Sequence, residues 1–257
     1  MDVLEHNSLA WDKEVENDGE WSRAVSSEVT EKAKKGIWNV ALTPAKSVPH
    51  EWFPDLKDLD VLCLASAGGQ QAPVFAAAGA NVTSFDNSAK QLQQDAFVAR
   101  RDKLKIRLEK GDAADLSRFA DNSFDLIFHP VSNCFFANLE PVWSEAFRVL
   151  RRGGSMLSGF TNPLFYIFDK RAEEKGILKV KYSLPYSDLQ SLSKNELAKQ
   201  IEQDLPLEFG HTLETQIGGQ LAQGFLISGF YEDYWTDRAT PLNKYLPVFM
   251  ATKALKL

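Results

Sequence analysis

Short apolar runs alternate with stretches of helical periodicity from Asp60 to about residue 160, and this alternation limits the fold more than any other feature of the chain. The candidate strands are VLCLA, NVTSF, KIRLEK, SFDLIFHP and SMLSGF, and the candidate helices are APVFAAAGA, SAKQLQQDAFVARRD and LEPVWSEAFRVLRR. Strands and helices at this spacing form right-handed crossovers and a parallel sheet covered on both faces. We therefore predict an α/β fold with a doubly wound, Rossmann-like sheet.

The rest of the chain is less regular. Residues 20–35 predict a helix that ends at Gly36, and prolines then interrupt the chain. Beyond Thr161 the expected elements are a helix over 163–176, a strand over 177–184, helices over 193–204 and 211–225, and strands over 227–235 and 246–255. The last two strands are close enough for an antiparallel hairpin at the sheet edge. The predicted segments are a helical and aromatic cap (1–57), a core (58–160), a lid or substrate insertion (161–210), and a C-terminal helix and hairpin that complete the core sheet (211–257).

Charge and composition limit the partners. The formal net charge is −6, whereas a protein that binds a phosphate backbone usually has a basic surface, so we expect no nucleic-acid partner. No apolar run approaches the roughly 20 residues that span a bilayer, and MDVLEHNSLA lacks the regions of a signal peptide. Cys63 and Cys134 are too few for a disulfide framework or a zinc cluster. We predict a cytoplasmic protein with no membrane contact and no metal.

The stretch CLASAGGQQ joins the first strand to the first helix of the alternation. Ligands of doubly wound sheets bind beyond the carboxyl ends of the strands. Small residues let the backbone approach a ligand, Gly68 and Gly69 permit unusual backbone angles, and the amides that open the next helix can face a ligand. A tight strand-to-helix turn without a ligand would have a similar sequence, so other residues are needed to distinguish a ligand-binding turn from a structural one.

Two aspartates follow the next two strands. Asp86 ends the second strand, about 20 residues after the turn, where a carboxylate can accept both hydroxyls of a ribose. Asp112 follows the third strand, where it can accept a hydrogen bond from an adenine amino group. Each aspartate alone is commonly a cap or turn residue. Together, at the ends of successive strands, they outline an adenosine site.

The glycine pattern distinguishes two adenosine-containing cofactors. The dinucleotide fingerprint G-x-G-x-x-G needs glycines where this chain has Ala65, Ala67 and Gln70, which argues against NAD. Residues 166–170 (YIFDK) match the Y-x-x-x-K of short-chain dehydrogenases. Because those enzymes also need a glycine-rich first turn, we interpret this match as coincidental.

Five motifs, in their order and spacing, resemble those of the class I S-adenosylmethionine-dependent methyltransferases, specifically the small-molecule type. They are VLCLASAGG (61–69), TSFDNS (83–88), KGDAADL (110–116), SFDLIFH (123–129) and FRVLRRGG (147–154), and AQGFLISGFYED and LPVFMATKAL resemble the family's final hairpin. The resemblance covers about residues 58–160 and 211–255. It implies S-adenosylmethionine as the cofactor, S-adenosylhomocysteine as the product, and residues 58–160 as the cofactor-binding core.

The first turn departs from the family pattern at three positions. The family usually has an acidic residue at position 63 and glycines at 65 and 67, whereas this chain has Cys63, Ala65 and Ala67. The methyl groups of the two alanines are expected to require ordinary φ values and to leave less room. Either Gln70 and backbone amides take the place of the missing carboxylate, or the cofactor binds more weakly.

The resemblance assigns cofactor contacts position by position. The first turn would line the methionine part, Asp86 would hold the ribose, Asp112 would bind the adenine, and His129, at the end of the fourth strand, would lie beside the sulfonium. The implied cofactor-binding residues are Ala65, Ser66, Ala67, Gly68, Gln70, Asp86, Asn87, Gln91, Asp112, Ala113 and His129.

Methyl transfer from a sulfonium needs alignment of the reactants and exclusion of water more than it needs a catalytic side chain. A general base is required only if the acceptor loses a proton early. His129 and His211 are the candidates for contact with the acceptor, and either is also compatible with a structural role. Trp11 or Trp21 is a candidate to close over the cofactor, where an aromatic face favours a cation.

We predict a methyltransferase that acts on a small-molecule acceptor as a monomer or homodimer. The stretch HPVSNCFF lacks the N/D-P-P-Y/F motif of nucleic-acid methyltransferases. Two alternatives are an NAD-dependent oxidoreductase, which nicotinamide binding would identify, and a protein that binds S-adenosylmethionine or S-adenosylhomocysteine without turnover.

Overall fold

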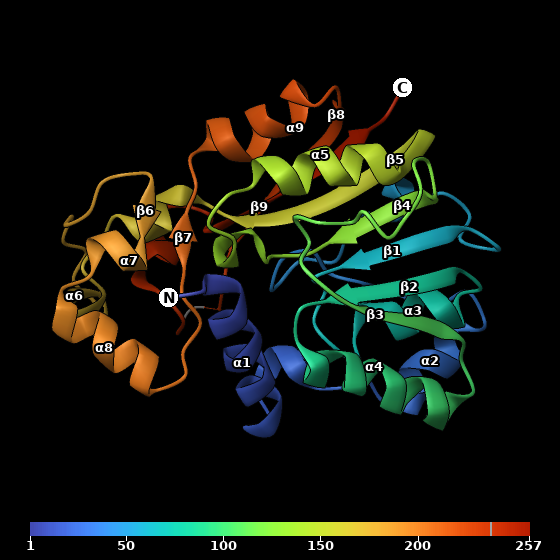
Figure 1. Ribbon diagram of the computed structural model, residues 1–257, viewed down its shortest axis with the longest axis horizontal. Coiled ribbons are helices and arrows are strands. Elements are labelled where there is room, and N and C mark those ends of the chain that lie inside the picture. Colours follow the sequence, from blue (N-terminus) through green and yellow to red (C-terminus); the bar gives the residue numbers. More distant parts are fainter. Residues whose placement is uncertain (237) are drawn as a thin grey trace.

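In residues 1–236 and 238–257, which the computed structural model describes, seven strands form one sheet in the order β3-β2-β1-β4-β5-β9-β8 (Figure 1). The strands are β1 (Asp60–Leu64), β2 (Asn81–Asp86), β3 (Ile106–Lys110), β4 (Phe124–His129), β5 (Leu150–Thr161), β8 (Leu226–Asp233) and β9 (Phe249–Leu255). β1 to β5 pair in parallel, and β9 runs antiparallel to both of its neighbours. The predicted doubly wound, mostly parallel sheet with a C-terminal antiparallel pair is confirmed.

The strand order reverses at the centre of the sheet. The chain runs outward from β1 to β3, then returns to pair β4 against the free side of β1. In open α/β sheets this reversal leaves a crevice beyond the carboxyl ends of the central strands, where ligands bind. The turns after β1, β2 and β4 therefore face a common space.

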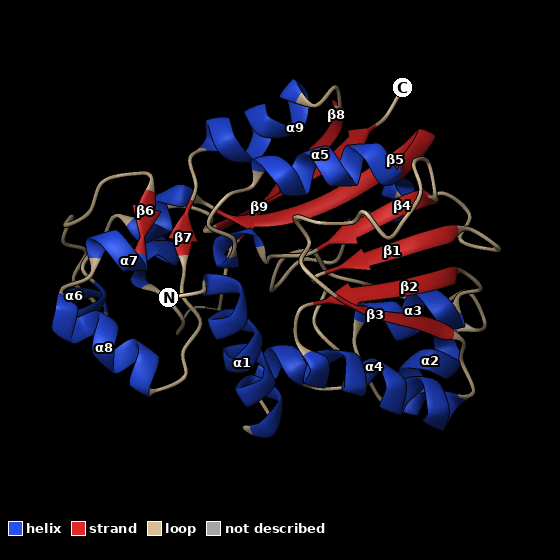
Figure 2. Ribbon diagram, viewed as in Figure 1, coloured by secondary structure: helices blue, strands red, loops and turns tan. Residues whose placement is uncertain are grey.

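Helices cover both faces of the sheet (Figure 2). They are α1 (Val3–Glu16), α2 (Ser27–Ala33), α3 (Gln71–Ala77), α4 (Ala89–Asp102), α5 (Glu140–Val149), α6 (Lys170–Glu173), α7 (Asp188–Ser191), α8 (Lys194–Glu202) and α9 (Gly219–Ala222). Side chains of β1 alternate between the faces, as strand geometry requires. Val61 and Cys63 pack toward α2 and α3, and Leu62 and Leu64 pack toward α5, so both faces are apolar core.

The insertion after β5 lies beside the carboxyl end of the sheet and differs from the sequence prediction (Figure 1). The predicted strand over 177–184 is wrong, because this segment forms only an isolated bridge between Phe168 and Val180. The helix predicted over 163–176 is two short turns, the second of which is α6. A small antiparallel sheet of β6 (Tyr186–Ser187) and β7 (Phe209–Gly210) organises the insertion instead.

Two further helix predictions are corrected. The helix predicted over 20–35 is a 3₁₀ turn at Glu20–Ser22, an extended link and α2, after which Gly36 adopts a φ of 79° as expected near a helix end. The helix predicted over 211–225 contains a π-helical stretch at Glu214–Gly218 before α9. The first helix, α1, lies within the predicted helical and aromatic cap (1–57), although no helix was predicted over its own residues, and it covers the ligand crevice.

Candidate active site

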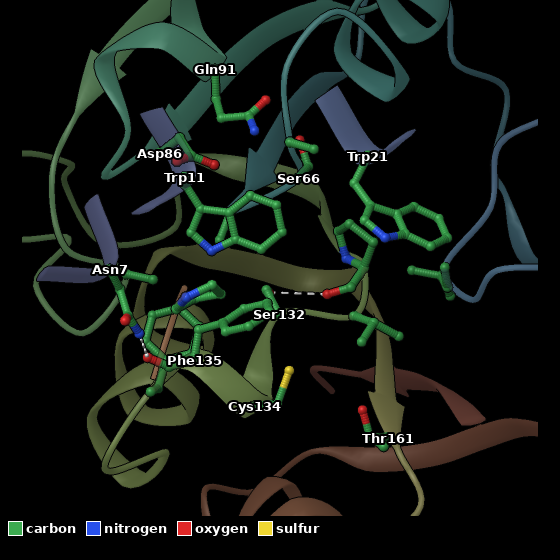
Figure 3. Close-up of a pocket in the computed structure, with 18 of the residues that line it drawn as sticks. Asn7, Trp11, Trp21, Ser66, Asp86, Gln91, Ser132, Cys134, Phe135 and Thr161 are labelled. Carbon is green, nitrogen blue, oxygen red and sulfur yellow. Dashed lines mark hydrogen bonds between the residues drawn. The ribbon is translucent and has the colours of Figure 1, made fainter. Parts of the chain in front are cut away.

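A cavity of about 470 Å³ lies at the carboxyl ends of the central strands, between the sheet, α1 and the insertion (Figure 3). A volume of this size is typical of small-molecule sites. Most of the predicted cofactor contacts line it: Ala65, Ser66, Ala67, Gln70, Asp86, Asn87, Gln91 and Ala113. The sequence therefore identified the cavity from the ends of β1, β2 and β3.

The turn after β1 adopts left-handed backbone angles at its alanines. Ala65 has a φ of 46° and Ala67 a φ of 59°, beside Gly69 at 74°. The expectation that the alanine methyl groups require ordinary φ values is wrong. A residue with a Cβ pays roughly 1–2 kcal/mol to enter this region. The turn thus keeps a backbone geometry that suits glycine and tolerates the strain of two alanines.

Ala65→Gly and Ala67→Gly are each expected to raise the free energy of unfolding by about 1 kcal/mol, because glycine enters left-handed angles without strain. Urea unfolding of the two variants measures this. The matched control is Ala96→Gly within α4, which is expected to lose about 1 kcal/mol. A loss in all three variants would contradict strain at the turn.

Two side chains of α4 hold the turn in place. The Gly68 N–H donates to Gln91 Oε1 at 2.7 Å, and the Gly69 N–H donates to Asp95 Oδ1 at 2.7 Å. The other oxygen of Asp95 accepts from Ser84 Oγ at 2.6 Å. Asp95 is fully buried, and burial raises its pKa to about 7. Asp95 thus places a buried carboxyl group, with both oxygens hydrogen-bonded, behind the turn.

This arrangement accounts for the missing acidic residue at position 63. Cys63 is buried with a raised pKa, so it cannot act as a carboxylate. Gln70, the expected substitute, instead donates from Nε2 to the carbonyls of Glu20 and Arg23 at 3.3 and 3.2 Å. Asp95, which the sequence analysis missed, holds the backbone of the turn from α4.

Asp86 is the charged group of the cofactor end. It is buried, lines the cavity and accepts from the Ser88 N–H at 2.8 Å through Oδ1. Burial raises its pKa to about 6, although the amides of Ser88 and Asn87 oppose the shift. Its second oxygen is available to a ligand hydroxyl, as the adenosine interpretation requires.

Two other predicted contacts have different roles. Gln91 lines the cavity, but its side-chain amide is already hydrogen-bonded within the protein. Oε1 accepts from the Gly68 N–H, and Nε2 donates to Ser22 Oγ at 2.6 Å. Asp112 does not line the cavity, although its neighbour Ala113 does, and its carboxylate accepts from the Ala114 N–H at 2.9 Å. Its contact with adenine stays a prediction.

The two histidines do not reach the cavity. His129 is fully buried, with Nδ1 2.9 Å from the Leu64 carbonyl and Nε2 2.7 Å from Asn133 Oδ1. His211 is buried, with Nε2 2.8 Å from the Phe136 carbonyl. Burial lowers the pKa of both imidazoles. Each ring joins neighbouring segments of the chain and neither lines the cavity, so the structure gives no support to the predicted role of His129 at the cofactor or of both residues in catalysis, and these roles stay predictions.

The buried Ser66 hydroxyl indicates whether a polar ligand would fit the cavity. It is buried at the wall beside the turn and has no hydrogen-bond partner among the oxygen and nitrogen atoms of residues 1–236 and 238–257. Buried polar groups are rarely left unpaired in native proteins. Together with Asp86, Ser66 fits a ligand that carries hydroxyl groups and a polar end.

Helix α1 covers the cavity. Trp11 and Trp21 both line it, and the Trp11 ring lies edge-on to Phe135 at 5.0 Å (Figure 3). Asn7 fixes α1 to the insertion by donating to the Leu207 carbonyl at 3.1 Å and accepting from the Leu207 N–H at 2.8 Å. Ser8 Oγ donates to the Asn87 carbonyl at 2.6 Å on the core side. The helix therefore bridges core and insertion above the site.

Comparisons with known proteins agree with this site. The family model of a methyltransferase domain, Methyltransf_11, matches residues 62–158. The uncharacterized methyltransferase YbaJ of Bacillus subtilis (strain 168) is 52% identical over 255 residues, 99% of each chain. A sterol 24-C-methyltransferase of Gibberella zeae is 35% identical over 101 residues, 38% of this chain and 26% of that one. An S-adenosylmethionine-dependent methyltransferase structure from Mesorhizobium loti superposes with a TM-score of 0.60 at 17% identity, covering 80% and 94% of the two chains.

Fold and site define a Rossmann-like protein with a ligand cavity at the strand ends. With its relative at 52% identity, the chain belongs to the class I S-adenosylmethionine-dependent methyltransferases, and its cofactor is S-adenosylmethionine. In the part of the chain that the structure describes, no group of three or more His, Cys, Asp and Glu residues is placed to hold a metal ion. No helix there is both long and apolar enough to cross a membrane.

Proposed function

We propose that this methyltransferase acts on a small molecule held in the same cavity as the cofactor. The supporting observation is that one cavity runs from the turn after β1 to the aromatic residues of the insertion beneath α1. A ligand site covered by a helix suits a small acceptor better than a polymer. We also propose, as predicted from the sequence, that the enzyme is cytoplasmic and acts as a monomer or homodimer.

S-adenosylmethionine supplies an electrophilic methyl group on a sulfonium, and transfer is an in-line displacement. The chain's own residues bind and orient. Asp86 would accept ribose hydroxyls, Ser66 would hold the amino-acid end, and Trp11 would exclude water from above. Alignment and exclusion of water provide most of the rate acceleration in such a reaction.

Asp86→Ala is expected to weaken S-adenosylmethionine binding by about tenfold to a hundredfold, because hydrogen bonds to an ionised group contribute about 1.5–3 kcal/mol. Isothermal calorimetry with S-adenosylmethionine, S-adenosylhomocysteine and NAD measures this. The pKa of Asp86 is about 6, and only the ionised carboxylate accepts from both hydroxyls. Wild-type affinity should therefore fall as the pH drops below about 6, and the affinity of Asp86→Ala should not.

The control is Asp115→Ala, an exposed aspartate of the following loop, which should leave binding unchanged. Asp112→Ala is the informative companion, because an unchanged affinity supports its position outside the cavity and a tenfold loss would support the predicted adenine contact. NAD binding without binding of the sulfonium compounds would overturn the proposal. Cofactor binding that is insensitive to Asp86 would remove the adenosine site assigned here.

A further inference from the structure

The cavity has an acceptor end, which we define as the part lined by Phe135, Phe165, Tyr166, Trp235, Phe249 and Glu208. In Figure 3, Cys134 and Thr161, which belong to the same region, lie at the opposite side of the cavity from Asp86 and Gln91. The rings form a continuous wall. The centroids of Phe165 and Trp235 are 6.1 Å apart, and those of Trp235 and Phe249 are 5.3 Å apart.

The charges that face the cavity all have one sign. Among the described residues that line it, the ionisable acids are Glu14, Asp86 and Glu208, and no lysine, arginine or histidine lines it. Glu14 lies on α1 and Asp86 at the end of β2, so Glu208 is the charged group of the acceptor end. An anionic acceptor such as a phosphate or carboxylate would find no counter-ion there, and a cation would find one.

The backbone of Glu208 is fixed at the cavity wall by hydrogen bonds. Its N–H donates to Asp188 Oδ2 at 2.8 Å, and the Asp188 N–H donates to the Glu208 carbonyl at 3.0 Å. Asp188 is fully buried and also accepts from the Tyr186 hydroxyl at 2.6 Å and from Gln200 Nε2 at 2.7 Å. The small β6–β7 sheet of the insertion therefore fixes the backbone that carries this carboxylate, as a preorganised binding group requires.

The carboxylate of Glu208 is incompletely paired by the protein. Its nearest cation is Lys170 Nζ at 3.8 Å, beyond hydrogen-bond distance, on a half-exposed side chain that does not line the cavity. Burial raises the pKa of Glu208, and Lys170 opposes this shift. A neutral apolar acceptor gives no physical reason for such a group in an aromatic wall, because a carboxylate loses hydration there and its one nearby cation lies at 3.8 Å.

We propose that the methyl acceptor is a primary or secondary amine on an apolar body, bound as an ammonium by Glu208 and by the aromatic faces around it. This inference rests on the proposed function. Aromatic rings and a carboxylate together stabilise an ammonium by cation–π attraction and charge pairing. Glu208 accepts one proton from the ammonium, which frees the nitrogen lone pair. The nitrogen forms the new N–C bond as the S–C bond breaks, the S–C electron pair stays on sulfur, and the methylated product leaves as an ammonium.

The test measures binding to the full-length protein saturated with S-adenosylhomocysteine, using three probes of similar shape: 2-phenylethylamine, 2-phenylethanol and 3-phenylpropanoate. Calorimetry is expected to show the amine binding at least about tenfold more tightly than the alcohol, and the carboxylate more weakly than either. Glu208→Gln should reduce amine affinity by about tenfold and leave alcohol affinity unchanged. The matched control, Glu14→Gln, changes the other glutamate that lines the cavity and should keep the amine preference.

The outcomes separate the two proposals. Failure to bind S-adenosylhomocysteine would overturn the proposed function and this inference together. Retained S-adenosylhomocysteine binding with equal affinity for amine and alcohol, or with no affinity for the amine, would overturn the amine assignment alone and favour a neutral acceptor. An equal effect of Glu14→Gln and Glu208→Gln would overturn the role given to Glu208. The wild-type comparison needs no variant, so it decides the acceptor charge even if Glu208→Gln does not fold.

Discussion

Asp95→Ala is expected to lower the free energy of unfolding by about 2–5 kcal/mol, because it leaves the buried Gly69 N–H and Ser84 hydroxyl without their acceptor. S-adenosylmethionine affinity should fall by about tenfold or more, since the turn that lines the cofactor end loses its support. Urea unfolding measures the first effect, and calorimetry measures the second in the folded variant. No other substitution proposed for this site removes two buried hydrogen bonds at once.

Asp95→Asn is the matched control. Its amide oxygen can accept from Gly69, and its amide nitrogen can donate to Ser84 Oγ, so both hydrogen bonds are kept. We expect stability and affinity close to those of the wild type at pH 6. An equal loss in both variants would show that the negative charge, and not the pair of hydrogen bonds, supports the turn.

The pH dependence of stability provides a second comparison. The pKa of Asp95 rises from 3.8 to about 7 on folding, so the folded state binds this proton more tightly than the unfolded state. Stability from this group is therefore present at low pH and is lost as the pH rises from about 4 through 7. Asp95→Asn should remove that part of the loss, which urea unfolding at pH 5 and pH 8 would detect. The same slope in both proteins would contradict a raised pKa at Asp95.

The cavity wall formed by the turn after β1 and by Asp86 could be predicted from the sequence because the carboxyl ends of parallel strands meet at one edge of the sheet. The carboxyl ends of β1 and β2 converge at one edge of the sheet, so the turn at 65–70 and Asp86 had to lie together once the alternation was recognised. The direction of a single side chain is less determined. His129 ends β4 at the same edge, yet its ring is used by Leu64 and Asn133 within the core.

The positions of α1 and of the insertion depend on long-range contacts that local sequence patterns do not predict. Asp2 accepts from the Glu5 N–H at the start of α1, a capping signal of short range, and the helix lacks a wide apolar stripe. Its position depends on a long-range contact, because Asn7 exchanges hydrogen bonds with the backbone of Leu207. The strands β6 and β7 have two residues each, too few to show a period. For this reason, the residues that line the acceptor end could not be predicted from sequence patterns.

The two adjacent glycines of the turn after β1 are required for different reasons, one for its backbone angle and the other for a close contact. Gly69 has a φ of 74°, so it needs the freedom that glycine provides. Gly68 does not have a positive φ. A Cβ on Gly68 would lie 1.9 Å from the carbonyl oxygen of Gln91 in α4. Gly68 is therefore required by the close approach of two backbones, which is also what allows its N–H to reach Gln91 Oε1.

Gly68→Ala is consequently expected to destabilise the protein by about 3 kcal/mol or more, since neither backbone can yield without moving α4 or the turn. S-adenosylmethionine binding should be lost or weakened at least about tenfold in any folded fraction, because Ala67 and Gln70 move with the turn. Urea unfolding and calorimetry measure the two effects. Gly218→Ala is the matched control, because its Cβ would meet nothing closer than 3.6 Å at helical backbone angles, and it should be neutral or stabilising. Normal stability of Gly68→Ala with intact cofactor binding would show that α4 can retreat from the turn, and Asp95 on the same helix would then not hold the turn rigidly.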